Sequence, residues 1–192
     1  MSALWIFLLI SVGPMAIRGH VEFNNVICNV RDKMFMGFEY CYLKSENRTY
    51  KYLSLKTRIN HLPLDNCQTR FQLRMRENRR IPYNFDFNVD SCKFMRERKH
   101  VIANWVYQSF AAYSNINHTC PYDVSERCHV LPLNLRLFLL HRQHDIVVDK
   151  LPVQHMNKMV QSIIPDGRYM MNSTWVIAGI PRTDVLLYFT KS

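Results

Sequence analysis

The chain has few glycines and none of the sequence motifs of common enzymes. Five glycines occur in 192 residues, so the sequence contains neither a flexible glycine-rich linker nor a phosphate-cradling glycine loop. It also lacks the G-x-S-x-G and H-E-x-x-H patterns of serine hydrolases and zinc peptidases. No internal repeat or low-complexity segment interrupts it. These absences favour a single domain that is not an enzyme.

Long hydrophobic runs are also missing. The N-terminal apolar segment covers residues 3–13, whereas a helix that spans a bilayer needs about 20 residues. Small and turn-forming residues follow it, as in a secretory signal. We interpret residues 1–19 as a signal peptide that is removed and residues 20–192 as one secreted domain. No later window is apolar enough to cross a membrane, so we do not expect an integral membrane protein.

Glycosylation acceptors and cysteines agree with export. The Asn-x-Ser/Thr pattern occurs at Asn47, Asn117 and Asn172, and glycans are bulky, so we expect all three side chains on the exposed surface. Six cysteines are present. In an oxidising compartment they favour disulfide bonds, although sequence alone does not choose the pairing. The prediction is a secreted, extracellular, disulfide-bonded glycoprotein.

Positive charge is in excess. The 25 lysines and arginines outnumber the 15 acidic residues, which gives a net charge of +10. Nucleic-acid binding needs such a basic surface, but secretion and the lack of a nucleic-acid motif argue against that partner. We expect the basic clusters at 74–80 and 93–100 to lie at strand ends in water. The alternative is attraction to anionic lipid headgroups, acidic glycans or an acidic receptor face.

The main structural pattern is alternation with a period of two, which predicts strands with one buried face. Over residues 69–77 the residues expected to face inward are Phe71, Leu73 and Met75. Over residues 83–90 they are Phe85, Phe87 and Val89. Over 49–59 alternation places Leu53 and Leu55 inward and Ser54 outward. The other strand candidates are 21–30, 35–44, 145–150, 169–178 and 184–190.

One segment has helical periodicity instead. Over residues 101–114 one helical face collects Ile102, Trp105, Val106, Ser109, Phe110 and Tyr113. A second helix is predicted at 153–163. Many short antiparallel strands with one amphipathic helix indicate a mainly β fold, a two-sheet antiparallel β-sandwich or β-cup.

Several segments taken in order resemble a known family. They are FEYCYLKSENRTYKYLSL (38–55), YNFDFNVDSCKFM (83–95), SNINHTCPYD (114–123), DKLPV (149–153) and PDGRYMM (165–171). This set resembles a large family of secreted insect proteins of unknown function, related to the chemosensory CheB proteins. More remotely, it is similar to the lipid-recognition superfamily of the ganglioside activator protein. The resemblance implies an immunoglobulin-like sandwich whose two sheets part at one edge around an apolar cavity.

The same resemblance bears on the cysteines and on one insertion. The family's four usual cysteines fall on Cys28, Cys41, Cys92 and Cys120. Residues 124–143 separate two family segments, and their removal would leave CPYDHDIVVDKLPV in the family register. Our hypothesis is that they are a translated intron or a misjudged exon boundary. The alternative is a true loop or hairpin, because leucines alternate from 133 to 139.

Two cysteines lie outside the family's four. They are Cys67 and Cys128, and the second belongs to the insertion at 124–143. If the insertion is real, the two could pair with each other. If it is spurious, Cys67 is left without a natural partner.

Two residue pairs could suggest site chemistry. His141 and His144 are three residues apart, but a zinc site needs a third and a fourth ligand in a defined frame. Asp86 and Asp90 share a strand face, but that face alternates with phenylalanines and is therefore expected to be solvated. We expect no catalytic residue, no cofactor and no metal ion.

The apolar residues indicate a function. The chain contains 11 phenylalanines, 10 tyrosines, 3 tryptophans and 10 methionines, which can fill a solid core or line a hollow one. The resemblance favours a cavity, with Phe85, Phe87, Trp105 and Phe110 as candidate wall residues. We therefore predict a secreted, non-enzymatic binding protein for a lipid or other apolar small molecule, with a chemosensory, pheromone-related role implied by the resemblance. The alternative is a solid-cored extracellular module that binds a cell-surface receptor or another secreted protein.

Overall fold

The computed structural model describes residues 20–47, 50–61, 63–76, 84–120, 145–160 and 164–192. These residues form eight strands, three α-helices and a 3₁₀ helix. In chain order the elements are β1 (Val21–Val30), β2 (Met36–Ser45), β3 (Lys51–Ile59), β4 (Cys67–Met75), β5 (Asn84–Asp90), α1 (Ser91–Glu97), α2 (Val101–Phe110), η1 (Ala111–Tyr113), β6 (Ile146–Pro152), α4 (Val153–Val160), β7 (Gly167–Ile177) and β8 (Ile180–Lys191). The predicted signal peptide at 1–19, the insertion at 124–143 with Cys128 and His141, and the following His144 lie outside the described residues.

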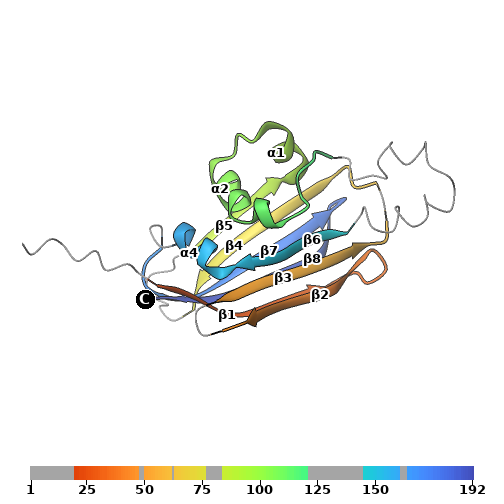
Figure 1. Ribbon diagram of the computed structural model, residues 1–192. Coiled ribbons are helices and arrows are strands. Elements are labelled where there is room, and N and C mark those ends of the chain that lie inside the picture. The colour runs from red at the N-terminus through yellow and green to blue at the C-terminus, as the bar shows by residue number, and fades with distance from the viewer. Residues whose placement is uncertain (1–19, 48–49, 62, 77–83, 121–144, 161–163) are drawn as a thin grey trace, which may run out of the picture.

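The strands form two antiparallel sheets. One has five strands in the order β1-β8-β7-β4-β5, and the other has three in the order β2-β3-β6. Figure 1 shows them as two layers, with α1 and α2 beside β5 and with α4 following β6. The predicted mainly β, two-sheet antiparallel sandwich is confirmed.

The strands lie where the sequence predicts them and bury the predicted faces, with one exception. In β4, Phe71 and Leu73 turn toward the space between the sheets, while Arg70 and Arg74 are exposed on the other side. The exception is Ser54, which was expected to face water but is fully buried. It lies on the central strand of the narrow sheet, where its hydroxyl accepts a hydrogen bond from the backbone of β6.

The basic cluster at 93–100 was expected at a strand end in water. Most of its basic side chains are exposed as expected, but the first part of the segment is helical. Residues Ser91–Glu97 form α1. The side chain of Asp90 caps the helix by accepting a 2.8 Å hydrogen bond from the backbone nitrogen of Lys93. Phe94 and Met95 are buried, so Lys93 and Arg96 lie on the outer side of a packed helix. Beyond the helix, the Arg98 guanidinium lies 4.0 Å from the centroid of the Tyr107 ring.

The helix predicted at 101–114 is confirmed over most of its length. It runs as α2 from Val101 to Phe110 and continues as η1 to Tyr113. The His100 side chain caps the N-terminus of α2, where its ring accepts a 3.1 Å hydrogen bond from the backbone nitrogen of Ala103. The helix predicted at 153–163 is confirmed as α4 over Val153–Val160.

Two disulfides form among the four cysteines that the family resemblance singled out. Cys28–Cys41 joins β1 to β2, which are edge strands of different sheets. Cys92–Cys120 joins α1 to the segment that follows η1. Cys67 is a free thiol at the start of β4. The first bridge therefore ties the two sheets together along one edge.

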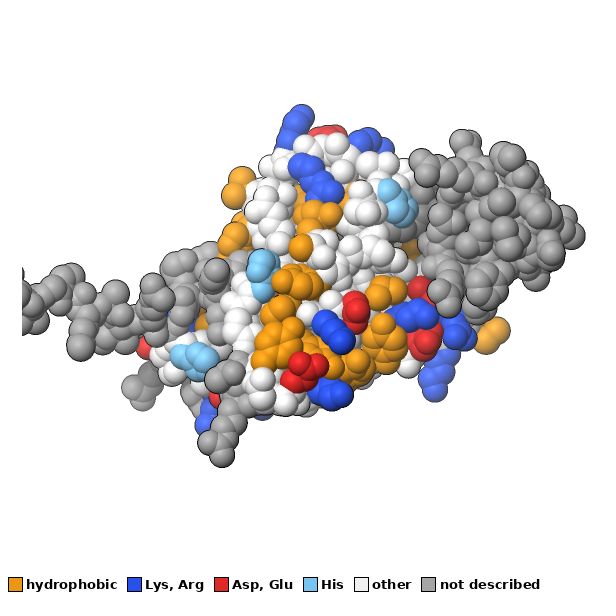
Figure 2. Space-filling model, viewed as in Figure 1, with side chains coloured by type: hydrophobic (Ala, Val, Ile, Leu, Met, Phe, Trp, Pro, Cys, Tyr) orange, Lys and Arg blue, Asp and Glu red, His pale blue; other side chains and the backbone are white. Residues whose placement is uncertain are grey.

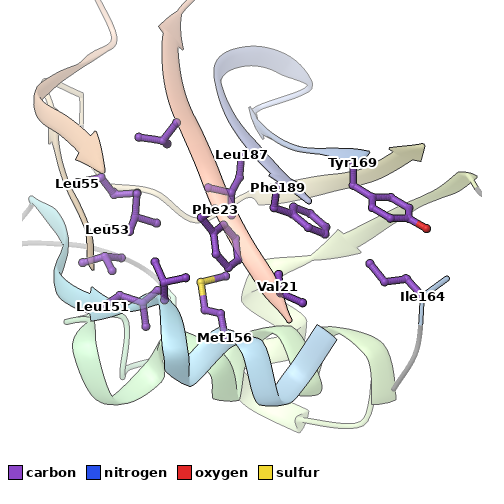
Figure 3. Close-up of a cluster of buried hydrophobic side chains, with 13 residues drawn as sticks. Val21, Phe23, Leu53, Leu55, Leu151, Met156, Ile164, Tyr169, Leu187 and Phe189 are labelled. Atoms are coloured by element: carbon purple, nitrogen blue, oxygen red, sulfur yellow. The ribbon is translucent and has the colours of Figure 1, made fainter. Parts of the chain in front are cut away.

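Side chains from both sheets meet in the main core, drawn in Figure 3. The Phe189 ring of β8 packs against Phe23 of β1 and Tyr169 of β7, with centroid distances of 5.5 and 5.3 Å. Leu151 of β6 and Met156 of α4 approach this cluster from the other layer. This core lies at the end of the sandwich that α4 covers.

The opposite edge, between β5 and β6, is occupied by helices. Phe94 of α1 and Ala103 of α2 pack with Val89 of β5. Beyond η1 the Asn115 side chain holds β6, since its Nδ2 donates to the Asp145 carbonyl at 2.6 Å and its Oδ1 accepts from the backbone of β6. The sheets are thus bridged directly at β1 and β2, whereas at the opposite edge α1 and α2 pack on β5 and the segment after η1 hydrogen-bonds to β6.

Candidate functional site

The space between the sheets contains a cavity of about 540 Å³. Strands of both sheets and the inner face of α2 form its wall. Phe71, Leu73 and Met171 contribute from the five-stranded sheet, and Leu55 and Val148 contribute from the three-stranded sheet. A solid core would leave no such volume, because protein interiors are packed as densely as organic crystals.

The four wall residues predicted from sequence all line this cavity. Phe85 and Phe87 reach it from β5, and Trp105 and Phe110 reach it from α2. The rest of the predicted helix face joins them, except for Tyr113, whose ring packs against His155 of α4 instead. The amphipathic face of α2 therefore serves as cavity wall.

The cavity reaches the surface beside β5 and the first turn of α2. Three of its lining side chains are strongly exposed: Phe85 at 41%, Ile102 at 46% and Val101 at 82%. Single exposed apolar side chains are common, but a group of them at a cavity marks an opening that favours apolar contacts. We define Phe85, Val101 and Ile102 as the mouth.

A few polar groups interrupt the apolar wall. The Thr69 and Ser91 hydroxyl oxygens lie 2.8 Å apart, and Ser91 also hydrogen-bonds the Cys67 thiol. The oxygen of Ser173 accepts from the indole nitrogen of Trp175 at 3.2 Å. Burial raises the pKa of the Cys67 thiol to about 11, so this cysteine stays protonated and unreactive at physiological pH.

Sequence reasoning missed the polar pair of Thr69 and Ser91. A signal for Thr69 existed, because the alternation that turns Phe71 inward places Thr69 on the same face two residues earlier. No comparable signal marked Ser91, since its position depends on α1, which the sequence did not predict.

Charged groups lie on the outer faces. On the five-stranded sheet the guanidinium of Arg70 binds both oxygens of Asp86, at 2.8 and 2.6 Å. This contact, with a hydrogen bond from Gln72, lowers the pKa of Asp86 to about 2. On the outside of the other sheet, Lys56 pairs with Glu39 at 2.7 Å. Figure 2 shows that hydrophobic side chains alternate with charged ones over β2 and β3.

The glycosylation acceptors differ in exposure. Asn47, between β2 and β3, and Asn117, beyond η1, are exposed as expected. Asn172 is only half-exposed, in a strand flanked by β4 and β8. Its Nδ2, the atom that a glycan would modify, donates to the Thr174 hydroxyl at 3.3 Å. The expectation of three exposed acceptors therefore fails at Asn172.

The described residues contain neither a cluster of metal-ligating side chains nor a membrane-spanning helix. No group of three or more histidine, cysteine or acidic side chains among them is placed to hold a metal ion. In the same part of the chain, no helix combines the length and hydrophobicity that a membrane crossing needs.

Comparison with known proteins identifies the family. The family described as a protein of unknown function (DUF1091) matches residues 69–171, more than half of the chain. The chain belongs to the DUF1091 family. No curated protein matches it. The DUF1091 match begins at Thr69 and takes in Ser91, the mouth and the four predicted wall residues. The family region thus contains much of the cavity wall.

Proposed function

We propose that this DUF1091 protein is a secreted, non-enzymatic binding protein that holds a lipid or other apolar small molecule between its two sheets. The observation that carries the proposal is the apolar cavity of about 540 Å³. Pockets for small molecules have volumes of roughly 300–1,000 Å³ and mostly apolar walls. Transfer of apolar ligand surface from water would drive binding, at roughly 25 cal/mol per Å².

Other features support the proposal. Two disulfides and two exposed Asn-x-Thr acceptors suit an extracellular protein. The resemblance to secreted CheB-related insect proteins and to the lipid-recognition superfamily agrees with a binding role, and it suggests a chemosensory ligand. The opening at the mouth gives such a ligand a route to the interior.

The cavity also bears on the alternative function. An interaction module that acts only through its surface gains nothing from an unfilled interior, because empty apolar volume costs stability. The unfilled space between these sheets therefore favours the binding protein over the solid-cored module.

The test is a ligand screen on protein secreted from eukaryotic cells and stripped of bound lipid. Fatty acids, hydrocarbons and sphingolipids would be added one at a time and followed by native mass spectrometry and thermal unfolding. A ligand at about 100 times its Kd stabilises the folded state by about 2.7 kcal/mol. This should raise the unfolding temperature by several degrees.

A matched pair of variants assigns binding to the cavity. Met171 lines it, whereas Met170, its neighbour on β7, points to the opposite face of the sheet. Met171→Trp should fill part of the cavity and abolish the ligand-induced shift. Met170→Trp should retain the shift. Failure of every ligand class to bind or stabilise the protein would refute the proposal, as would equal binding by the two variants.

A further inference from the structure

A compact group of three polar residues lies on the cavity wall where β4 meets α1. Cys67 and Thr69 lie on the inner face of β4, and Ser91 is the first residue of α1. The oxygens of Thr69 and Ser91 are 2.8 Å apart, and Ser91 contacts the Cys67 thiol. The Asp90 cap fixes the start of α1, so this arrangement is held by a strand and a capped helix.

The protons of this group can be arranged in two ways. Each hydroxyl has one donor and two lone pairs, and a neutral thiol has one weak donor. If Cys67 donates to Ser91 and Ser91 to Thr69, the Thr69 proton can be donated to an oxygen of a ligand. If the chain runs in reverse, Thr69 offers lone pairs to a ligand hydroxyl. The group can donate or accept a hydrogen bond, and in both arrangements it is uncharged.

The rest of the wall determines whether a bound molecule can carry a charge. Among the described residues that line the cavity, none is a lysine, arginine, histidine, aspartate or glutamate. An ionised carboxylate or phosphate moved into this space would lose its hydration without a balancing charge, which is far more costly than burying a neutral oxygen that is hydrogen-bonded. A neutral oxygen placed at Thr69 and Ser91 would regain the hydrogen bond that it gave up in water.

We propose that Thr69 and Ser91 form an oxygen-binding subsite that selects an uncharged aliphatic molecule with an alcohol, aldehyde, ketone or ester group. This inference rests on the proposed function and narrows it, because it states which apolar molecules the cavity takes and which end of the molecule is anchored. A pocket of this kind uses apolar surface for affinity and a few polar groups for orientation.

The experiment measures displacement of an environment-sensitive naphthylamine dye by dodecanol and by dodecane. Thr69→Val replaces the hydroxyl with a methyl group of similar size, so it should weaken dodecanol binding about five-fold and leave dodecane binding unchanged. Ser91→Ala should act in the same way. In both variants the dodecane affinity reports whether the cavity is intact.

Thr190→Val is the control, because it makes the same Thr→Val change outside the cavity. The Thr190 hydroxyl does not line the cavity and accepts a 2.9 Å hydrogen bond from the exposed side chain of Asn24. The affinities for dodecanol and dodecane should therefore both stay at wild-type values in this variant.

A second pair of probes tests the charge preference. Methyl dodecanoate should displace the dye at least ten-fold more effectively than dodecanoate at neutral pH, because only the ester is uncharged. Equal or tighter binding of the acid would overturn the subsite proposal, as would equal effects of Thr69→Val on dodecanol and dodecane; either outcome leaves the apolar-binding function in place. Failure of all four compounds to displace the dye would overturn the proposed function and the subsite together.

Discussion

Removal of the Cys28–Cys41 bridge should lower stability by an amount that follows from its loop length. The bridge spans a sequence separation of 13. Closing a loop of this size lowers the entropy of the unfolded chain and raises its free energy by about 3 kcal/mol. For a domain of this size, each kcal/mol corresponds to about 2–4 °C in Tm. The variant Cys28→Ala, Cys41→Ala should therefore unfold about 6–12 °C below the wild type.

The assay is urea unfolding followed by tryptophan fluorescence, with Tm from calorimetry. Cys67→Ala is the matched control, because it also removes a sulfur atom but leaves both bridges intact; its cost should be well below that of the bridge variant. Alkylation of the unfolded but unreduced protein, followed by mass spectrometry, should show one free thiol among the five described cysteines. Equal destabilisation by the two variants would refute the account of a bridge that ties β1 to β2.

Three further predictions concern individual side chains. Burial alone would raise the pKa of Asp184, but hydrogen bonds led by that from Arg31 lower it below its ordinary value. A lowered folded pKa gives stability above the unfolded value of about 3.9 that is lost as pH falls through the folded pKa. Asp184→Asn should thus lower Tm at pH 7 and reduce the further fall of Tm as the pH drops below about 4. If calorimetry shows the same fall of Tm with pH in the variant and the wild type, this explanation is wrong. Asp90→Ala removes the α1 cap and should cost about 1 kcal/mol in urea unfolding, and a cost near zero would mean that the cap is unimportant. Glycopeptide mass spectrometry should find Asn172 unmodified and the two exposed acceptors occupied, and a glycan at Asn172 would show that β7 is accessible before folding.

Strand positions were predictable because each strand has one buried face. In β4 the alternation of Phe71 and Leu73 with exposed arginines defines both the strand and its orientation. The α2 face was predictable for the same reason, since its apolar side chains recur at helical spacing. Patterns of this kind depend only on which side of an element meets water.

The missed features depend on tertiary contacts. Helix α1 is seven residues long, which is too short for periodicity to separate it from a strand end, although Asp90 is a residue type that favours an N-cap. In the sequence, Ser54 occupies a position that alternation assigns to the outer, solvent-facing side of its strand. In the structure the neighbouring strand β6 contacts it, and the backbone nitrogen of Lys150 donates a 3.0 Å hydrogen bond to the Ser54 hydroxyl.

The cavity itself could not be derived from composition. Phe85, Phe87, Trp105 and Phe110 would suit a filled core as well as a hollow one. The hollow depends on tertiary structure, because a disulfide joins β1 to β2 at one edge while α1 and α2 pack on β5 at the other. The sequence resemblance supplied the expectation of a cavity, and the arrangement of the two edges explains it physically.

The most direct test of a ligand-holding interior is a crystal structure of the protein purified from its native tissue, at a resolution that shows bound lipid. We predict continuous elongated density between the two sheets, with one polar end beside Thr69 and Ser91. An interior closed by the inward side chains, with no space between β5 and β6, would contradict the account.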